Sequence, residues 1–195
     1  MRSSAASDVY KRQLVKCIMN EIEHDGTLTL GHNVQIGYFA QNQASLLDEN
    51  LTVFQTIDDV AKGEIRNKIR DLLGAFMFGG PEESMKKVKV LSGGERTRLA
   101  MIKLLLEPVN LLILDEPTNH LDNQGRNRLY EWVKKCRSTL IVVSHDRTLL
   151  NRLPETCELS RNALVCYGGN YEFYKQQKEL QQNALQQQLN EKEKE

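Results

Sequence analysis

The sequence of 195 residues carries no net charge, because 26 lysines and arginines are balanced by 26 aspartates and glutamates. This balance excludes a general electrostatic attraction to nucleic acid or to an anionic membrane, so any such contact has to be local. Long apolar runs are missing as well. The longest have the size of a strand and fall far short of the roughly 20 residues that a membrane-spanning helix needs. The sequence therefore predicts no membrane-spanning segment.

Cysteine is scarce, and its spacing is uninformative. The four cysteines form neither a C-x-x-C pair nor a zinc-binding pattern; they are Cys17, Cys136, Cys157 and Cys166. Such usage fits a reducing cytosol better than the disulfide framework of a secreted domain. We therefore expect a cytoplasmic protein without a disulfide framework.

The most informative stretch is an apolar run, Leu111 to Leu114, that ends in two adjacent carboxylates, Asp115 and Glu116. The run is typical of a buried strand in a parallel sheet, and open α/β sheets bind their ligands at the carboxyl ends of such strands. Alternate side chains of a strand point to opposite faces, so the two carboxylates should serve different tasks. One can face a Mg²⁺ ion and the other a water molecule. A helix cap beside a solvated neighbour is the alternative interpretation of this pair.

A second stretch, Ser92-Gly93-Gly94-Glu95, has the S-x-x-E form of a capping box ahead of a helical run from Arg96 to Leu106. A well-capped helix is one interpretation. It leaves the glycine pair unexplained, since glycine costs about 1 kcal/mol per residue in a helical turn. Glycines do allow backbone amides to approach an anion closely. The stretch therefore favours phosphate binding.

A third stretch, Ser144-His145-Asp146, follows the apolar strand expected at Leu140 to Val143. Parallel strands end at the same edge of a sheet, so His145 should lie near the carboxylates. A histidine in this place is often a structural hydrogen bonder, and this interpretation stays open beside a catalytic one.

The forms L-S-G-G-E at 91–95, L-D-E-P-T-N-H-L-D at 114–122 and S-H-D at 144–146 resemble the nucleotide-binding domain of ATP-binding-cassette proteins. They are closer still to the ABC-F subfamily of ribosome-associated ATPases. The resemblance runs from about Leu14 to about Tyr174. It implies an α/β fold of the P-loop NTPase type, with a parallel sheet, a helical lobe, a small antiparallel β subdomain and a C-terminal helix. It also implies ATP and Mg²⁺ as ligands and ATP hydrolysis as the activity.

The same resemblance implies a role for each residue of the hydrolytic site. Asp115 corresponds to the aspartate that supports Mg²⁺, and Glu116 to the residue that polarises the attacking water. His145 corresponds to the histidine that senses the γ-phosphate. Gln41, just beyond the strand expected at 34–39, falls where these cassettes have the glutamine that reaches Mg²⁺ and the water.

The resemblance also implies partners. The segment Ser92-Gly93-Gly94-Glu95 addresses the γ-phosphate held by a second cassette, and Asp122 matches the loop that contacts that cassette, so the active unit is a pair. Asn119-His120 favours an ABC-F protein, acting on the ribosome and its rRNA, over the ATPase subunit of a membrane transporter, which usually has serine and alanine there. A non-enzymatic interaction fragment is the third alternative.

The phosphate-cradling loop of these cassettes, G-x-x-x-x-G-K-[ST], is expected immediately before Leu14 but occurs nowhere in the sequence. Residues 1–13 resemble translated adapter sequence, and a genuine disordered N-terminus is the alternative; we treat them as a leader. We expect a truncated nucleotide-binding domain at 14–170, inactive as a fragment, and a polar helical extension or linker at 171–195. The missing part should contain a strand that lies against 111–114.

The remaining elements follow from periodicity and turn signals. They are a helix at 14–22, short antiparallel strands at 27–30 and 34–39, helices at 51–61 and 65–78, and a closing hairpin of 157–159 with 163–167. Between the two strands of the site, the residues that recur at helical spacing and predict the buried face of a crossover helix are Leu129, Trp132, Val133 and Cys136.

Overall fold

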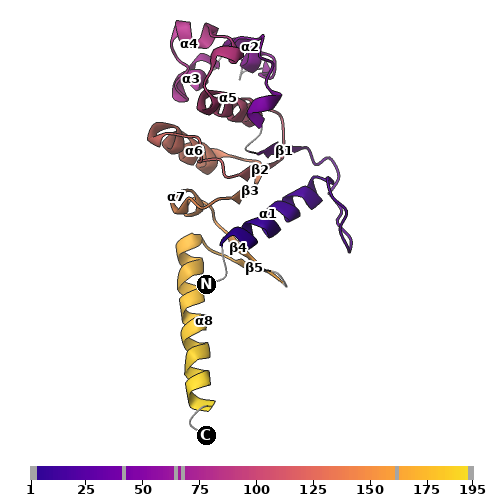
Figure 1. Ribbon diagram of the computed structural model, residues 1–195, viewed down its shortest axis with the longest axis vertical. Helices are drawn as coiled ribbons and strands as arrows, with labels where there is room; N and C mark the ends of the chain where they lie inside the picture. The colour runs from indigo at the N-terminus through magenta and orange to yellow at the C-terminus, as the bar shows by residue number, and fades with distance from the viewer. Residues whose placement is uncertain (1–3, 41–42, 64–65, 67–68, 161–162, 193–195) are drawn as a thin grey trace. The chain divides into compact units, whose positions relative to one another are not determined.

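A computed structural model describes residues 4–40, 43–63, 66, 69–160 and 163–192 (Figure 1). Residues 17–145 form one compact unit, and residues 146–195, together with those up to Lys16, form another. The first unit contains the parallel sheet and the helices around it. The second contains most of the first helix, a hairpin and the last two helices.

Three parallel strands form the centre of the first unit, and Figure 1 shows them side by side: β1 (Ile36–Phe39), β2 (Leu111–Asp115) and β3 (Thr139–Val143). Their order is β1-β2-β3, and Ile113 is paired with Tyr38 on one side and Ile141 on the other. Leu112, Ile113 and Leu114 are at most 1% exposed. The predicted buried strand is therefore confirmed, and β2 has the continuous apolar run of a central parallel strand.

Two predictions about the neighbours of β2 were wrong. A missing strand was expected against Leu111 to Leu114, but β1 and β3 occupy both sides of β2. Residues 34–39 were expected in an antiparallel pair, whereas Ile36–Phe39 joins the parallel sheet, and residues 27–30 form no strand. A β-carbon on Gly37 would lie 3.1 Å from three apolar side chains, so the glycine permits close packing on β1. An apolar run indicates burial but not which distant strand provides it.

Four helices gather into a lobe (Figure 1): α2 (Val53–Asp58), α3 (Ile69–Ala75), α4 (Pro81–Met85) and α5 (Gly93–Leu106). Short 3₁₀ turns at Gln43–Leu46 and Val88–Val90 precede α2 and α5. Thr52 begins α2 with a reciprocal capping box to Gln55. The core of the lobe consists of fully or almost fully buried apolar side chains, among them Val53, Ile57, Leu73, Phe78, Val88 and Leu99. The helices predicted at 51–61 and 65–78 are confirmed, with shorter bounds.

The crossover helix α6 (Asn123–Lys135) connects β2 to β3. Leu129 and Val133 are buried, as the helical spacing predicted. Trp132 and Cys136 are only partly buried, which differs from their expected place on the buried face. Tyr130, one position along the helix from Leu129, is buried instead, at 7% exposure.

The second unit contains α7 (Arg147–Leu150), the antiparallel strands β4 (Thr156–Leu159) and β5 (Leu164–Tyr167), and α8 (Tyr171–Lys192). The predicted hairpin is confirmed. Cys157 and Cys166 face each other in its register and form a disulfide, while Cys17 and Cys136 are free. This bridge corrects the expectation drawn from cysteine spacing, because the pairing depends on hairpin register, which spacing alone does not reveal.

The start of α8 is attached to the hairpin and to α7. Lys178 pairs with Glu158 of β4, and the rings of Tyr174 and Tyr167 meet edge to face with centroids 5.1 Å apart. Asn151 Oδ1 accepts the backbone N–H of Glu172 at 2.9 Å. Burial, aided by the nearby carboxylate of Glu158, raises the pKa of Tyr174 above its usual range. These contacts fix the first turns of α8, whereas its leucines further on are exposed.

The first helix, α1, runs from Ser4 to Ile18 and so begins and ends before the expected 14–22. It stops where Asn20 adopts a φ of 57° and its N–H bonds to the carbonyl of Cys17. A left-handed residue cannot continue a right-handed helix, and asparagine is among the residues that tolerate this conformation. Among the described residues, no helix is both long and apolar enough to cross a membrane.

Candidate functional site

The two adjacent carboxylates lie where the central strand ends. Asp115 is the last residue of β2 and is 6% exposed, and Glu116 is 9% exposed. Glu116 has a φ of 49°, and its N–H donates to the carbonyl of Val143 at 2.8 Å. The strand therefore stops before Glu116. A left-handed turn, rather than strand alternation, sets the direction of its side chain.

This turn brings the carboxylate of Glu116 against the end of β3. Ser144 Oγ and the backbone N–H of His145 each donate to Glu116 Oε2 at 3.4 Å. His145 Nε2 lies 3.5 Å from Glu116 Oε1, and the His145 side chain is 59% exposed. The expectation that His145 lies beside the carboxylates is confirmed. The arrangement leaves a carboxylate held on one side by protein donors, with a histidine ring that also faces solvent.

Ser144 was not among the residues predicted to carry the site. It is 8% exposed, and its hydroxyl is one of the groups that hold Glu116. Its position directly before His145, at the end of an apolar strand, was the available sequence signal. From the sequence alone, a serine in that position is interpreted as an ordinary loop residue, because the neighbouring carboxylate is not known.

Among the described residues, no three His, Cys, Asp or Glu side chains converge as a metal cage. Mg²⁺ is commonly held by one or two carboxylates together with phosphate oxygens and water. The buried carboxylate of Asp115 at the strand end fits that mode of binding. Gln41, the other predicted ligand, lies outside the described residues, so its role stays a prediction.

The N-terminus of α5 is a separate, well-defined feature. Ser92 is the N-cap, and both its N–H and its hydroxyl donate to Glu95 Oε2, at 2.8 and 2.7 Å. The predicted capping box is confirmed. The hydrogen bonds from the Ser92 hydroxyl and amide, with smaller contributions from Arg98 and Lys86, hold the pKa of Glu95 below its usual range.

The glycines of this turn are not required by packing inside the chain. A β-carbon on Gly93 would meet nothing within 4 Å, and one on Gly94 would lie 4.0 Å from the carbonyl oxygen of His120. Their lack of side chains therefore leaves room for another molecule. Backbone N–H groups at the start of a helix attract anions, so a phosphate suits this opening.

Asp122, predicted to contact a second cassette, is the N-cap of α6. Its Oδ1 accepts the N–H of Gly125 at 2.8 Å, and its side chain is exposed. Helix capping alone explains an aspartate at this position, and no contact with a second cassette is needed for that explanation. Its contact with a second cassette stays a prediction.

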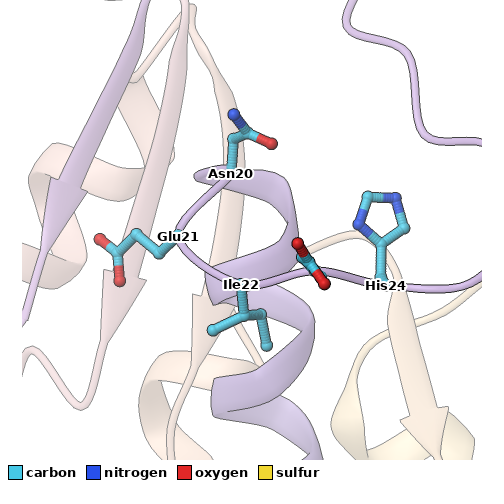
Figure 2. Close-up of a pocket in the computed structure, with 5 residues that line it drawn as sticks. Asn20, Glu21, Ile22 and His24 are labelled. Carbon is cyan, nitrogen blue, oxygen red and sulfur yellow. The ribbon is translucent and has the colours of Figure 1, made fainter.

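An open surface pocket is formed by the loop that follows α1, and its residues are far in the sequence from those described above (Figure 2). It is lined by Asn20, Glu21, Ile22, Glu23 and His24. None of the predicted site residues lines it. His24 is exposed there, as expected for a histidine in a surface turn.

The parallel sheet, with carboxylates at the end of its central strand and a serine-histidine pair after the next, defines an α/β domain of the kind that binds its ligand at this edge. A family model described as "ABC transporter" matches residues 11–119, more than half of the chain. The chain therefore belongs to the ATP-binding-cassette family.

Curated relatives are ABC-F proteins. The putative ATP-binding protein YdiF of Bacillus subtilis is 40% identical over 170 residues, which cover 86% of this chain and 26% of that protein. ABC transporter F family member 5 of Arabidopsis thaliana is 40% identical over 167 residues, covering 84% and 24%. The probable ATP-binding protein YbiT of Escherichia coli O157:H7 is 35% identical over 176 residues, covering 89% and 33%. The chain spans about a quarter to a third of the length of these relatives.

Solved structures share the fold. A dimeric ATP-binding cassette in a post-hydrolysis state with ADP and phosphate aligns with a TM-score of 0.53 and 22% identity, covering 65% of this chain and 59% of that one. A complex of an archaeal ribosome recycling factor with a ribosomal stalk protein aligns with a TM-score of 0.61 and 23% identity, covering 75% and 29%. The predicted fold class, a P-loop NTPase-like parallel sheet with a helical lobe and a small antiparallel sheet, is confirmed.

Proposed function

We propose that the chain is part of an ATP-hydrolysing cassette of an ABC-F protein, with Glu116 as the residue that activates water. The observation that carries the proposal is the Glu116 carboxylate, nearly buried after β2 and held by Ser144 and by the backbone of His145. A carboxylate held in this way is oriented before the reaction begins. Positioned general bases contribute about 10² to 10⁴-fold in rate.

The neighbouring groups supply complementary tasks. Asp115 would hold Mg²⁺, which neutralises charge on the transferred phosphoryl group. Glu116 orients a water molecule and accepts its proton. The ring of His145, next to Glu116 and open to solvent, would donate a hydrogen bond to a γ-phosphate oxygen. Gln41 stays in the proposal as a further group for Mg²⁺ and water.

The open glycine turn of α5 extends the proposal to a second cassette. Because Gly93 and Gly94 face space that this chain leaves free, their amides and the hydroxyl of Ser92 would address the γ-phosphate bound to a partner cassette. Asp122, at the N-cap of α6, would contact the same partner. ATP would then be enclosed between two cassettes.

The ribosome is the proposed target of the longer protein. The proposal rests on Asn119-His120 in the loop after Glu116 and on the ABC-F relatives. If it holds, the ATP-locked form of the longer protein co-sediments with ribosomes and their rRNA. Stable recovery with a membrane permease would instead favour a transporter ATPase, the alternative suggested by the description of the matching family model.

The test of Glu116 uses a longer polypeptide in which a complete phosphate loop precedes this segment. Glu116→Gln should retain ATP binding but lose hydrolysis, since the amide keeps the shape of the side chain and cannot accept a proton from water. Glu131→Gln makes the same chemical change on the exposed surface of α6 and serves as the control. Steady-state hydrolysis by Glu116→Gln within threefold of the control would contradict the role.

The second test concerns pairing. Ser92→Arg places bulk and charge in the opening beside Gly93 and should prevent ATP-dependent pairing of cassettes in the Glu116→Gln background. Pairing is measured by size-exclusion chromatography with and without Mg-ATP. Unchanged pairing would contradict the phosphate-binding role of this turn.

The 195-residue chain itself should bind Mg-ATP too weakly to measure and should not hydrolyse it. ATP is held chiefly through its phosphates by a glycine-rich loop and a lysine, and the sequence contains no such loop. Asp115 and Glu116 alone would present negative charge to a polyanion. Calorimetric titration is the direct measurement, and micromolar affinity would refute the expectation.

A further inference from the structure

We propose that Arg96 is a positioning residue that orients the first turn of α5 by joining it to the loop that carries Glu49. The proposal rests on the proposed function only where it names phosphate as the ligand of that turn. Arg96 itself lies in the second turn of the helix, so it acts through the residues that it holds.

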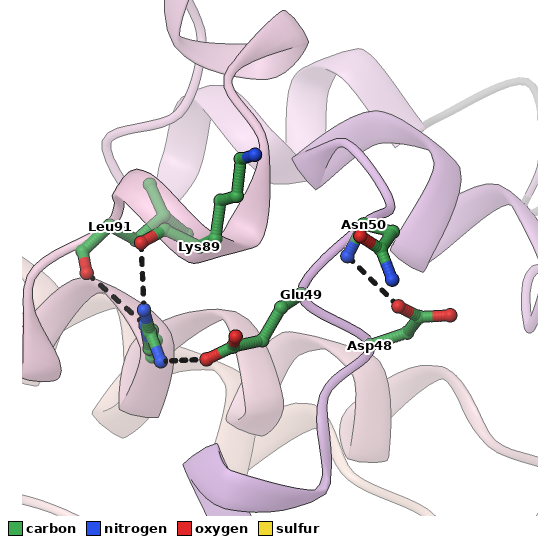
Figure 3. Close-up of polar contacts among 6 residues, drawn as sticks. Asp48, Glu49, Asn50, Lys89 and Leu91 are labelled. Atoms are coloured by element: carbon green, nitrogen blue, oxygen red, sulfur yellow. Dashed lines mark hydrogen bonds and ion pairs between the residues drawn. The ribbon is translucent and has the colours of Figure 1, made fainter.

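The guanidinium of Arg96 reaches three acceptors on two other segments. Figure 3 labels the three acceptor residues, Glu49, Lys89 and Leu91. Nε donates to the carbonyl of Leu91 at 3.2 Å, and one terminal nitrogen donates to the carbonyl of Lys89 at 2.8 Å. The other terminal nitrogen donates to Glu49 Oε1 at 2.7 Å. The planar guanidinium fork fixes the relative directions of these bonds, which the single ammonium of lysine cannot do.

The bond to Leu91 matters because of the peptide unit to which that carbonyl belongs. The carbonyl of Leu91 and the N–H of Ser92 are parts of one planar peptide group and point in opposite directions. Arg96 holds the oxygen, and Glu95 Oε2 accepts the N–H at 2.8 Å. The peptide plane is thereby fixed from both sides. This peptide leads directly into the N-cap Ser92 and the first helical residues Gly93 and Gly94, so holding it restricts the motion of that turn.

The same local arrangement occurs a second time, at the start of α6. Arg126 Nε donates to the carbonyl of Leu121 at 3.1 Å, five residues back, as Arg96 does to Leu91. In both cases a buried leucine, at 5% and 6% exposure, precedes the N-cap residue. The sequence pattern is L-S-G-G-E-R at 91–96 and L-D-N-Q-G-R at 121–126. Arg126 therefore provides a matched control within the chain.

Arg96 differs from this control in its additional bond to Glu49. Glu49 follows the 3₁₀ turn Gln43–Leu46, which packs against α5, and its own carbonyl accepts the N–H of Lys89 at 3.2 Å. The Glu49 side chain is 60% exposed, and exposed ion pairs contribute little to stability. The ion pair therefore contributes more to orienting the turn than to the free energy of unfolding. It links the loop after β1 to the turn that would face phosphate.

The test uses the amide signals of glycines in the ¹⁵N NMR spectrum of the 195-residue chain. Arg96→Ala should shift the signals of Gly93 and Gly94 and lower their order parameters from about 0.85 toward 0.6 or below. The signal of Gly125, in the first turn of α6, should stay unchanged. Arg126→Ala should do the reverse. Equal changes at all three glycines, or none at Gly93 and Gly94, would overturn the proposal.

Two further variants keep the test informative if Arg96→Ala does not fold. Glu49→Gln removes only the ion pair and should give a smaller shift at Gly93 and Gly94 with an unchanged thermal midpoint. Arg96→Lys should restore part of the wild-type signal positions. No response to Glu49→Gln would overturn the link to the loop after β1. These signals report the chain alone, so the pairing test with Ser92→Arg can fail while the positioning role holds.

Discussion

The backbone of Glu116 provides a sharp test of how the site is built. Its φ of 49° lies in the left-handed region, which costs an L-residue roughly 1–2 kcal/mol. Glycine adopts this conformation without that cost. We therefore expect Glu116→Gly to be more stable than Glu116→Ala, because both variants lose the carboxylate and only the alanine variant keeps the backbone strain.

The expected difference follows from two opposing contributions. Relief of the left-handed conformation favours glycine by roughly 1–2 kcal/mol, and the greater freedom of glycine in the unfolded chain costs about 0.5–1 kcal/mol. The central value of the net preference for glycine is therefore about 0.75 kcal/mol. With a denaturant slope of about 2 kcal/mol per molar urea, the midpoint should rise by roughly 0.4 M from alanine to glycine.

Urea unfolding followed by tryptophan fluorescence measures this difference, because Trp132 is the one tryptophan and lies in the same unit as Glu116. The control is Glu131, which lies on the exposed face of α6. There Glu131→Gly should be less stable than Glu131→Ala by about 1 kcal/mol. If glycine is also the less stable substitution at position 116, the strained turn is not a property of the folded chain. If it is the more stable, the folded chain carries backbone strain at position 116, and such strain is typical of functional sites.

Three further predictions concern stability. Hydrogen bonds from Ser92 lower the pKa of Glu95 in the folded chain below its ordinary value. The ionised Glu95 therefore stabilises the fold at neutral pH, and this stabilisation is lost as the pH falls through the lowered pKa. In urea titrations at different pH, Glu95→Gln should lack this loss. Leu114→Ala, at a residue with 0% exposure, should lower the free energy of unfolding by about 2–5 kcal/mol by the same assay. Reduction of the Cys157–Cys166 bridge should expose two more thiols to alkylation and destabilise the hairpin by roughly 2–3 kcal/mol, as judged by its thermal midpoint.

Local patterns in the sequence determined much of this protein. The apolar run at 111–114 identified the central strand, because a strand covered on both faces has no polar alternation. The S-x-x-E pattern located the start of α5, because capping is decided within four residues. The carboxylates and the S-H-D stretch identified the edge of the sheet where the chemistry would lie. Gln41 was predicted for the same site and lies outside the described residues.

Tertiary structure decided what these local patterns could not contain. The apolar run does not reveal which strands lie beside β2. One of them, β1, comes some 75 residues earlier in the chain. The disulfide depends on hairpin register, which sets Cys157 opposite Cys166. The positive φ of Glu116 turns its carboxylate to Ser144, and the fold brings Arg96 to Glu49. The disulfide joins residues only nine positions apart. The other contacts join distant segments, and their partners are selected by packing of the whole unit rather than by local propensity.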